Sequence, residues 1–325
     1  MKLAIVGAGG MGSFHARSLA ALPGVEIVAI ADLRVAAAQS LSEVVGGTAT
    51  ADGLGVAAMS ELDGVVIASP EDTHEELVHA ALSQGTRILC EKPLAVGAAA
   101  CRRIVDAEVA VGRRLLQLGL MRVFDPAHVQ LAAEVATLGD VHHVRGVHRN
   151  VHEVRRNAQL ILNQSLVHDI HSLRWLVGRD IVRVTTLATP NPEHVEHLLL
   201  TAEFEGAGYA TLEFSEHSSA YEVHVEVEAE LGGAAMAPVM RPTVRRGGSA
   251  CVNIGTDWFG RFAEAYRIEA AVWLDSIRAP MSVGPSAWDG LIAERVVEAA
   301  AESLRTHRAA DVAKLETPDL YRSRE

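Results

Sequence analysis

Cysteine is scarce in this chain. Its 325 residues include three cysteines, Cys90, Cys101 and Cys251. Because they are far apart and odd in number, they are typical of reduced thiols and not of a disulfide framework or a zinc motif. We therefore expect no structural metal.

Long apolar runs and concentrated basic charge are also missing. No apolar run reaches the ~18 residues needed to span a bilayer, and the chain opens directly on a strand pattern in place of a signal peptide, so we expect a cytoplasmic location. The formal net charge is −12, and no basic stretch stands out. This balance argues against nucleic acid or an anionic membrane as the main partner and favours small molecules.

The first part of the chain alternates short apolar runs with helical patterns, which is typical of a parallel sheet covered on both faces. The length favours about two domains, and we place them at 1–120 and 121–325. Strands are expected at 3–6, 26–31, 64–68, 87–90 and 115–118.

A glycine-rich motif follows the first strand. Its residues are Gly7, Ala8, Gly9, Gly10, Met11 and Gly12, and a helix is expected over 13–21. In the G-x-G-x-x-G pattern, the first glycine permits a tight turn, the second lets the backbone approach a pyrophosphate, and the third lets helix and strand pack closely. The motif predicts a dinucleotide-binding Rossmann domain, with the phosphates at the helix N-terminus.

Asp32 ends the second expected strand, about 20 residues after the last glycine, where a carboxylate accepts hydrogen bonds from an adenosine ribose. Arg34 would tolerate a 2′-phosphate, but the carboxylate would repel it. We therefore expect NAD as the cofactor and keep NADP as the alternative.

The pattern changes after Met121. A helix is expected to begin near Pro126, and period-two strands follow at 141–148, 182–187, 198–205, 210–216 and 222–231. These predict an α+β domain with an open antiparallel sheet, whose apolar face packs on helices or on a second subunit. Residues 232–248 are expected to form an irregular loop. A long amphipathic helix with an aromatic core stripe is expected over 259–277.

Lys92 follows Cys90-Glu91 and precedes Pro93, at the end of an expected strand. An amine held in this rigid turn can hydrogen-bond a substrate oxygen as its charge changes. The alternative is an ordinary surface Glu-Lys-Pro turn.

Residues 163–178 have a helical pattern with two sides. Gln164, His168, His171 and Trp175 share one side, which should face a cleft or solvent, and apolar residues occupy the other. His168 is the candidate general base, because an imidazole accepts a hydroxyl proton near neutral pH. The alternatives are a packed or solvated histidine and a metal pair of His168 with His171, for which the stripe offers no carboxylate.

Six stretches together resemble a known family. They are Gly7 to Gly12, Cys90 to Ala95, Gly119 to Arg122, His148 to Asn150, Leu166 to Asp169 and Gly284 to Asp289. They are similar to the glucose-fructose oxidoreductase and inositol dehydrogenase (Gfo/Idh/MocA) family, most closely its myo-inositol 2-dehydrogenase branch. The resemblance implies a Rossmann domain, an open-sheet domain and a homo-oligomer, commonly a tetramer formed through sheet faces.

The resemblance also implies roles for individual residues. Lys92 and His168 match the catalytic lysine and histidine. The residues implied along the nicotinamide side of the cofactor are Ser69, Pro70, His74 and Glu91. Those implied to line the substrate pocket are Met121, Arg122, Asn150, Ser165 and Tyr221.

Two positions depart from the family pattern. Gln164 and His171 stand where inositol dehydrogenases carry aspartates. A neutral amide orients the His168 ring but stabilises an imidazolium less than a carboxylate does. We predict an NAD-dependent oxidation of a cyclitol alcohol to a ketone. The alternatives are an amino- or keto-cyclitol or another sugar derivative as substrate, and a non-catalytic NAD-binding sensor.

Overall fold

The computed structural model describes the chain except residues 152–155, 190–193, 237–242, 253–254 and 323–325. Its contacts form two compact units. The first consists of Met1–Met121, Tyr266–Glu294 and Leu315–Glu325, and the second of Arg122–Ala265 and Arg295–Lys314. The first unit therefore includes two segments that follow residue 121, whereas the predicted division has one boundary at residue 120. In the described residues, we find no helix with the length and apolarity that a membrane crossing requires.

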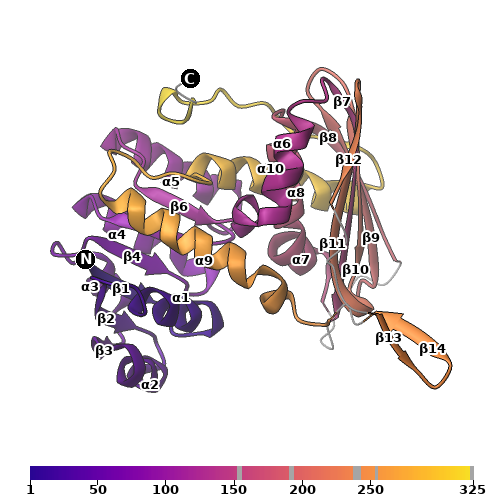
Figure 1. Cartoon of the computed structure of the whole chain (residues 1–325). Helices are drawn as coiled ribbons and strands as arrows, with labels where there is room; N and C mark the ends of the chain where they lie inside the picture. The colour runs from indigo at the N-terminus through magenta and orange to yellow at the C-terminus, as the bar shows by residue number, and fades with distance from the viewer. Residues whose placement is uncertain (152–155, 190–193, 237–242, 253–254, 323–325) are drawn as a thin grey trace. The chain divides into compact units, whose positions relative to one another are not determined.

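A six-stranded parallel sheet forms the centre of the first unit (Figure 1). Its strands are β1 (Lys2–Val6), β2 (Glu26–Ala31), β3 (Thr48–Thr50), β4 (Gly64–Ile67), β5 (Arg87–Glu91) and β6 (Leu116–Gly119), in the order β3-β2-β1-β4-β5-β6. The predicted parallel sheet is confirmed, and the short β3 is an addition to it. In this strand order, the crevice at the carboxyl ends of β1 and β4 is the place where ligands bind.

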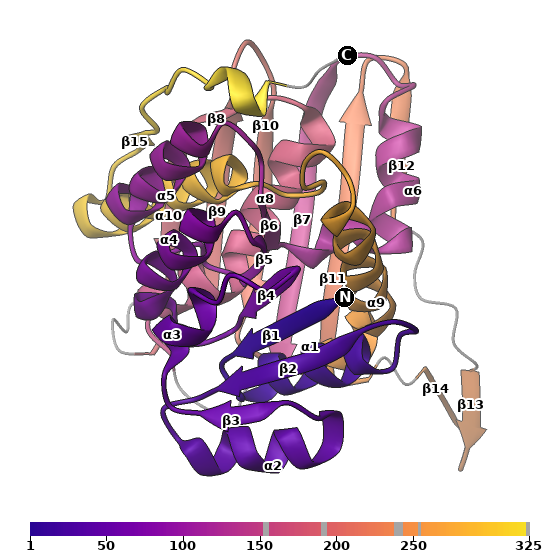
Figure 2. The ribbon, with the colours of Figure 1, turned by 90° about the vertical axis from the view of Figure 1, so that its left-hand side faces the viewer.

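Helices cover both faces of this sheet (Figures 1 and 2). One core contains residues of α1 (Gly10–Ala20), α2 (Val35–Val45) and α9 (Trp258–Ile277). The other contains residues of α3 (Gly53–Ala57), α4 (His74–Gln84), α5 (Ala98–Val111) and the first turns of α10 (Ala287–Thr306). The predicted aromatic helix is confirmed, because Phe262, Tyr266 and Trp273 of α9 are buried.

A seven-stranded sheet forms the second unit. Its strands are β7 (Val141–Val151), β8 (Ile181–Ala188), β9 (His197–Phe204), β10 (Tyr209–Ser215), β11 (His217–Ala229), β12 (Gly232–Ala235) and β15 (Ala310–Asp311), in the order β12-β11-β7-β10-β9-β8-β15. The sheet is mixed, which corrects the expected antiparallel sheet. Strands β7 and β10 run parallel because helices and two further strands separate them in the chain, which allows a crossover.

One face of this sheet carries helices and the other does not. The helical face has α6 (Pro126–Val135), α7 (Ala158–Ile161), a π-helix (Leu162–Leu166) and α8 (Val167–Val177). The opposite face carries no helix among the described residues (Figure 1). Side chains alternate between the two, so that Val223, Val225 and Val227 are buried.

The stretch expected to be an irregular loop, residues 232–248, contains strands. Gly232–Ala235 pairs with β11, and β13 (Thr243–Arg246) forms a hairpin with β14 (Ser249–Val252). The expectation was wrong for these residues because backbone pairing can form strands where side chains show no alternation; residues 237–242 lie outside the described part. Three 3₁₀-helices complete the described elements: Glu71–Thr73, Met121–Phe124 and Asp319–Tyr321.

Candidate active site

A cavity of about 740 Å³ lies at the carboxyl edge of the parallel sheet. Its lining combines the glycine motif, the end of β2 and the turn after β4. The predicted cofactor residues among the lining are Gly7, Gly9, Asp32, Arg34, Ser69 and Pro70. The structure therefore brings together residues that are far apart in the sequence, since Gly7 and Pro70 are separated by 63 positions.

The glycine motif leaves backbone where side chains would collide. Gly7 has φ +99°, and a Cβ added to it would lie 2.4 Å from the Ala68 carbonyl oxygen. A Cβ on Gly12 would lie 1.8 Å from the Gly7 carbonyl oxygen. By contrast, a Cβ on Gly9 would meet no atom within 4 Å. Gly7 and Gly12 are thus required by packing, whereas Gly9 keeps open the side on which a pyrophosphate would approach.

Helix α1 begins at Gly10, directly after this turn. Its N-cap, Gly9, contributes no side-chain hydrogen bond to the first-turn amides. Such amides carry partial positive charge and bind anions. The residues present therefore fit the dinucleotide that the motif predicts.

Asp32 is held by two backbone amides. Its Oδ2 accepts from Ala8 N at 2.8 Å and its Oδ1 from Arg34 N at 2.8 Å. The Arg34 side chain is 76% exposed, with Nε 3.6 Å from Asp32 Oδ1. A carboxylate fixed in this place suits a ribose hydroxyl and repels a phosphate.

His74 ties together two backbone turns near the same edge. Its Nε2 lies 2.9 Å from the Ser69 carbonyl oxygen and its Nδ1 2.9 Å from the Pro93 carbonyl oxygen. Ser69 Oγ is also within 2.7 Å of Thr73 Oγ1. His74 is buried, so it positions the turn after β4 and the turn that contains Lys92, and its side chain is not part of the cavity lining.

Glu91 is buried beside Lys92, at the end of β5. Its Oε1 accepts a hydrogen bond from His15 Nε2 at 2.7 Å, and its Oε2 accepts from the Lys92 backbone N–H at 3.3 Å. Burial by itself would raise the pKa of Glu91, but the hydrogen bond from His15 and the nearby charges lower it below the ordinary value. Glu91 is therefore ionised. The Lys92–Pro93 peptide bond is cis.

In the second unit, Asp169 and Arg122 form a buried ion pair that also includes His148. His148 Nδ1 lies 2.7 Å from Asp169 Oδ2. Burial by itself would raise the pKa of Asp169, but the charges of Arg122 and His148 hold it at about 2. The Tyr221 hydroxyl bonds to Arg122, and burial raises the pKa of Tyr221 to about 12. Near neutral pH the Tyr221 phenol is therefore uncharged, and Asp169 and Arg122 form an ion pair.

The hydrogen bonds continue from His148 through the end of the sheet. His148 Nε2 lies 3.1 Å from Asn150 Oδ1, and Asn150 Nδ2 donates to Ser165 Oγ at 3.3 Å and to Glu216 Oε2 at 3.4 Å. Four predicted substrate residues, Arg122, Asn150, Ser165 and Tyr221, thus belong to one buried polar network.

Arg156 closes this network at its outer end. It forms an ion pair with Glu216, which is fully buried, and its Nη2 donates to Ser165 Oγ at 3.0 Å. Its Nη1 lies 3.4 Å from Gln164 Oε1. Because a guanidinium only donates, the oxygen end of the Gln164 amide faces Arg156.

His168 and His171 lie on α8 and both are buried. The predicted helix is not a single α-helix, since Leu162–Leu166 forms a π-helix before α8 begins. The extra residue in a π-turn shifts Gln164 relative to His168, and such turns are frequent at functional sites. Burial of His168 and His171 excludes the solvent-facing alternative for these two side chains, and the cleft-facing alternative stays a prediction. Met121 is also buried.

No group of three or more histidine, cysteine or acidic side chains among the described residues is arranged to hold a metal ion.

Five residues of these networks were not predicted as site residues: His15, His148, Arg156, Asp169 and Glu216. His148 carried a signal, because it belongs to one of the six resembling stretches. Asp169 carried a signal, because it follows His168 directly. His15 carried another, because it lies on the buried side of α1 with Gly12 and Leu19. Arg156 and Glu216 gave none, since their pairing joins segments 60 positions apart.

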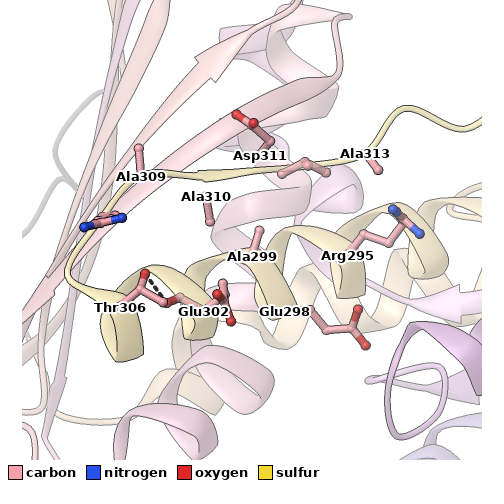
Figure 3. A pocket seen from close by; sticks show the side chains of 11 residues that line it. Arg295, Glu298, Ala299, Glu302, Thr306, Ala309, Ala310, Asp311 and Ala313 are labelled. Carbon is pink, nitrogen blue, oxygen red and sulfur yellow. Dashed lines mark hydrogen bonds between the residues drawn. The ribbon is translucent and has the colours of Figure 1, made fainter.

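A separate hollow of about 810 Å³ lies between α10 and residues 308–313 (Figure 3). Alanines and charged side chains line it, and the Thr306 hydroxyl donates to the Glu302 carbonyl oxygen at 2.8 Å. It contains none of the predicted site residues.

Comparison with known proteins agrees with this geometry. A family model described as an oxidoreductase family with an NAD-binding Rossmann fold matches residues 1–119. Inositol 2-dehydrogenase 1 of Saccharopolyspora erythraea is 36% identical, over 99% of each chain, and inositol 2-dehydrogenase of Rubrobacter xylanophilus is 38% identical, over 99% of this chain and 96% of its own. The crystal structure of Lactobacillus casei myo-inositol dehydrogenase with NAD(H) and myo-inositol has a TM-score of 0.95 at 26% identity, over 99% of each chain.

Proposed function

This chain belongs to the Gfo/Idh/MocA oxidoreductase family, and from that premise we propose that it oxidises a ring secondary alcohol of a cyclitol to a ketone with NAD. The cyclitol is the ligand class of the relatives whose names and titles mention inositol. The fixed carboxylate of Asp32 supports NAD over NADP.

The buried polar network of the second unit carries the proposal. Arg122, His148, Asn150, Ser165 and Asp169 form a buried row of fixed donors and acceptors, in which His148 and Asn150 lie on β7 and the other three on helical segments hydrogen-bonded to it. A ligand with many hydroxyl groups matches such a row, because each hydroxyl both donates and accepts. An apolar ligand could form no hydrogen bonds with these groups and would gain no affinity from them.

Each catalytic role follows from the chemistry of its side chain. His168 takes the hydroxyl proton as general base, which contributes typically ~10²- to 10⁴-fold. Lys92 donates a hydrogen bond to the substrate oxygen as negative charge develops on it, and Glu91 keeps the Lys92 backbone in place. NAD, when bound, would supply the hydride acceptor for the substrate carbon that carries the oxidised hydroxyl group.

Turnover of myo-inositol by the Lys92→Ala and His168→Ala variants tests this function. NADH formation followed by near-ultraviolet absorbance should fall by roughly 10²-fold or more in each, while NADH binding followed by fluorescence persists. Lys314→Ala and His79→Ala are matched controls, because both side chains are exposed. Lys314 pairs with Glu205, and His79 lies on α4 near Glu75. Unchanged turnover in either site variant would reject the assignment, and sustained NADH production by the unaltered protein excludes a pure sensor.

The contact between Arg156 and Gln164 favours a second candidate, a modified cyclitol or another sugar derivative as substrate. Because Gln164 presents its oxygen to Arg156, its nitrogen is the end that meets other groups, and a nitrogen donates where the family's aspartate would accept. A ring with a keto or ether oxygen would satisfy such a donor. A panel of inositols, inososes and O-methyl inositols, each assayed with NAD⁺ or NADH, separates the two candidates.

We also propose that the chain assembles into a homo-oligomer, a tetramer, through the helix-free face of the second sheet. Leu187, Leu199 and Tyr209 are 57%, 37% and 52% exposed there, and Leu187 and Leu199 are directly paired across β8 and β9. A broad sheet face with exposed apolar side chains is seldom left in water.

A further inference from the structure

We propose that His15 and Glu91 are positioning residues, which fix Lys92 relative to the helix that receives the coenzyme phosphates. The proposal rests on the function above, in which Lys92 is catalytic. Neither side chain is assigned a contact with the substrate.

The pair connects helix α1 to the end of strand β5 in the first unit. His15 lies on α1, whose N-terminus carries the glycine motif, and Glu91 ends β5 directly before Lys92. The hydrogen bond between them is 2.7 Å long, and the second carboxylate oxygen accepts the Lys92 N–H at 3.3 Å. One carboxylate therefore links the coenzyme-binding helix to the backbone of the catalytic amine.

The surroundings allow this carboxylate little freedom. Glu91 is paired in register with Gly119 of β6, and a Cβ at Gly119 would lie 3.1 Å from Glu91 Oε2. His15 is fully buried, and its ring centroid lies 5.7 Å from that of Phe14 in a tilted contact and 6.3 Å from that of Tyr266 in an edge contact. Side chains held by packing and by a second ring of hydrogen bonds keep a reactive group in one place.

Glu269 is a second buried carboxyl group in the first unit. Glu269 of α9 is fully buried, and neither of its carboxyl oxygens has a hydrogen-bond partner among the described residues. Burial and the charge of Glu91 raise the pKa of Glu269 well above its ordinary value, which favours the uncharged carboxyl group. Both hydrogen bonds from His15 and from the Lys92 backbone go to Glu91, and none goes to Glu269 among the described residues.

A double-mutant cycle tests the proposal with kcat on myo-inositol and with the Kd of NADH. Glu91→Gln and His15→Leu should each lower kcat by roughly 10- to 100-fold, because small misplacement of a reacting group costs that much. The Kd of NADH should change by less than about threefold. In a Lys92→Ala background, Glu91→Gln should have no further effect, since groups that act as a unit are not additive.

His15→Gln is the conservative variant, because its amide nitrogen can donate to Glu91 as Nε2 of the ring does. It should restore kcat to within about threefold of the unaltered protein, and it keeps the proposal testable if His15→Leu fails to fold. Glu108→Gln is the matched control: Glu108 is a buried carboxyl group of the same unit that accepts from Leu115 N and Leu116 N at 2.6 and 2.7 Å. It should leave kcat unchanged.

The outcomes distinguish a failure of the proposed function from a failure of the positioning role. If Lys92→Ala alone keeps full turnover, the proposed function fails. If Lys92→Ala loses turnover but Glu91→Gln does not, or if the two losses multiply, only the positioning role is overturned. A parallel loss of NADH binding in Glu91→Gln would also overturn it, because the pair would then serve coenzyme affinity.

Discussion

His148 donates from Nδ1 to the Asp169 carboxylate at 2.7 Å, and both side chains are buried in the second unit. Arg122 bonds to the same carboxylate. Asp169 is therefore the shared partner of two basic groups, and its loss would leave a buried guanidinium without its anion.

Asp169→Asn should destabilise the protein by about 3–5 kcal/mol at pH 7, the usual cost of breaking a buried ion pair. The carboxyl group has a pKa of about 2 in the folded chain, below the value of about 3.9 when unfolded. Its ionised form thus contributes stability in full above pH ~4, and this contribution, about 2 kcal/mol, is lost as the pH falls toward 2.

Urea denaturation at several pH values measures this difference. The unaltered protein should lose stability between about pH 4 and pH 2 more steeply than Asp169→Asn does. Parallel curves for the two proteins in this window would contradict the role given to the carboxylate.

Gly12→Ala and Gly9→Ala should fail in different ways. A Cβ at Gly12 collides with the Gly7 carbonyl oxygen, so Gly12→Ala should lower the melting temperature by several degrees or prevent folding. A Cβ at Gly9 meets no atom, and its φ of −73° suits alanine, so Gly9→Ala should fold normally. It should weaken NADH binding by roughly tenfold or more, because the methyl group occupies the pyrophosphate side. Calorimetry and fluorescence titration check the pair, and equal stability of both variants would contradict the packing argument.

Gln164→Asp should increase myo-inositol oxidation by less than about tenfold. The new carboxylate would pair with Arg156 in place of stabilising the His168 imidazolium. The measurement is kcat/KM with myo-inositol, with Gln159→Asp as control because Gln159 is an exposed glutamine of the neighbouring helix α7. A gain of 10²-fold or more would show that Arg156 does not hold the side chain at position 164.

Leu199→Glu should dissociate the proposed oligomer, because each copy would place a carboxylate in an apolar contact. Size-exclusion chromatography with light scattering gives the mass, and Val129→Glu on α6 is the control at another exposed apolar position, since Val129 is 45% exposed. The proposed interface is wrong if Leu199→Glu keeps the oligomer, or if Val129→Glu dissociates it equally.

Much of the fold could be predicted from sequence because its signals are local. The glycine motif, the apolar strands and the aromatic stripe of α9 each involve neighbours within one or two turns or strands. The parallel pairing of β7 with β10 was missed, since register between distant strands leaves no local pattern. The π-helix at 162–166 was missed because its sequence fits an α-helix equally well.

The site residues also fall into those that local sequence predicts and those that it does not. Motif positions such as Gly7, Asp32 and Lys92 could be found, because the chemistry requires those residue types at those spacings. The partners that hold them could not. His15 reaches Glu91 across 76 positions, and Arg156 reaches Glu216 across 60, so only the folded chain reveals these pairs.

The completion of the first unit by late segments has a consequence for biosynthesis. Tyr321 stacks on Trp288 and donates its hydroxyl to Glu108 at 2.5 Å, so it packs against α10 and α5, two of the helices that cover the sheet containing β1. When only residues 1–120 have been synthesised, the glycine motif is present but Trp273 is not. Trp273 packs against Gly64 of the parallel sheet. The nucleotide-binding unit therefore reaches its final packing only after residues 266–294 and Tyr321 have been synthesised.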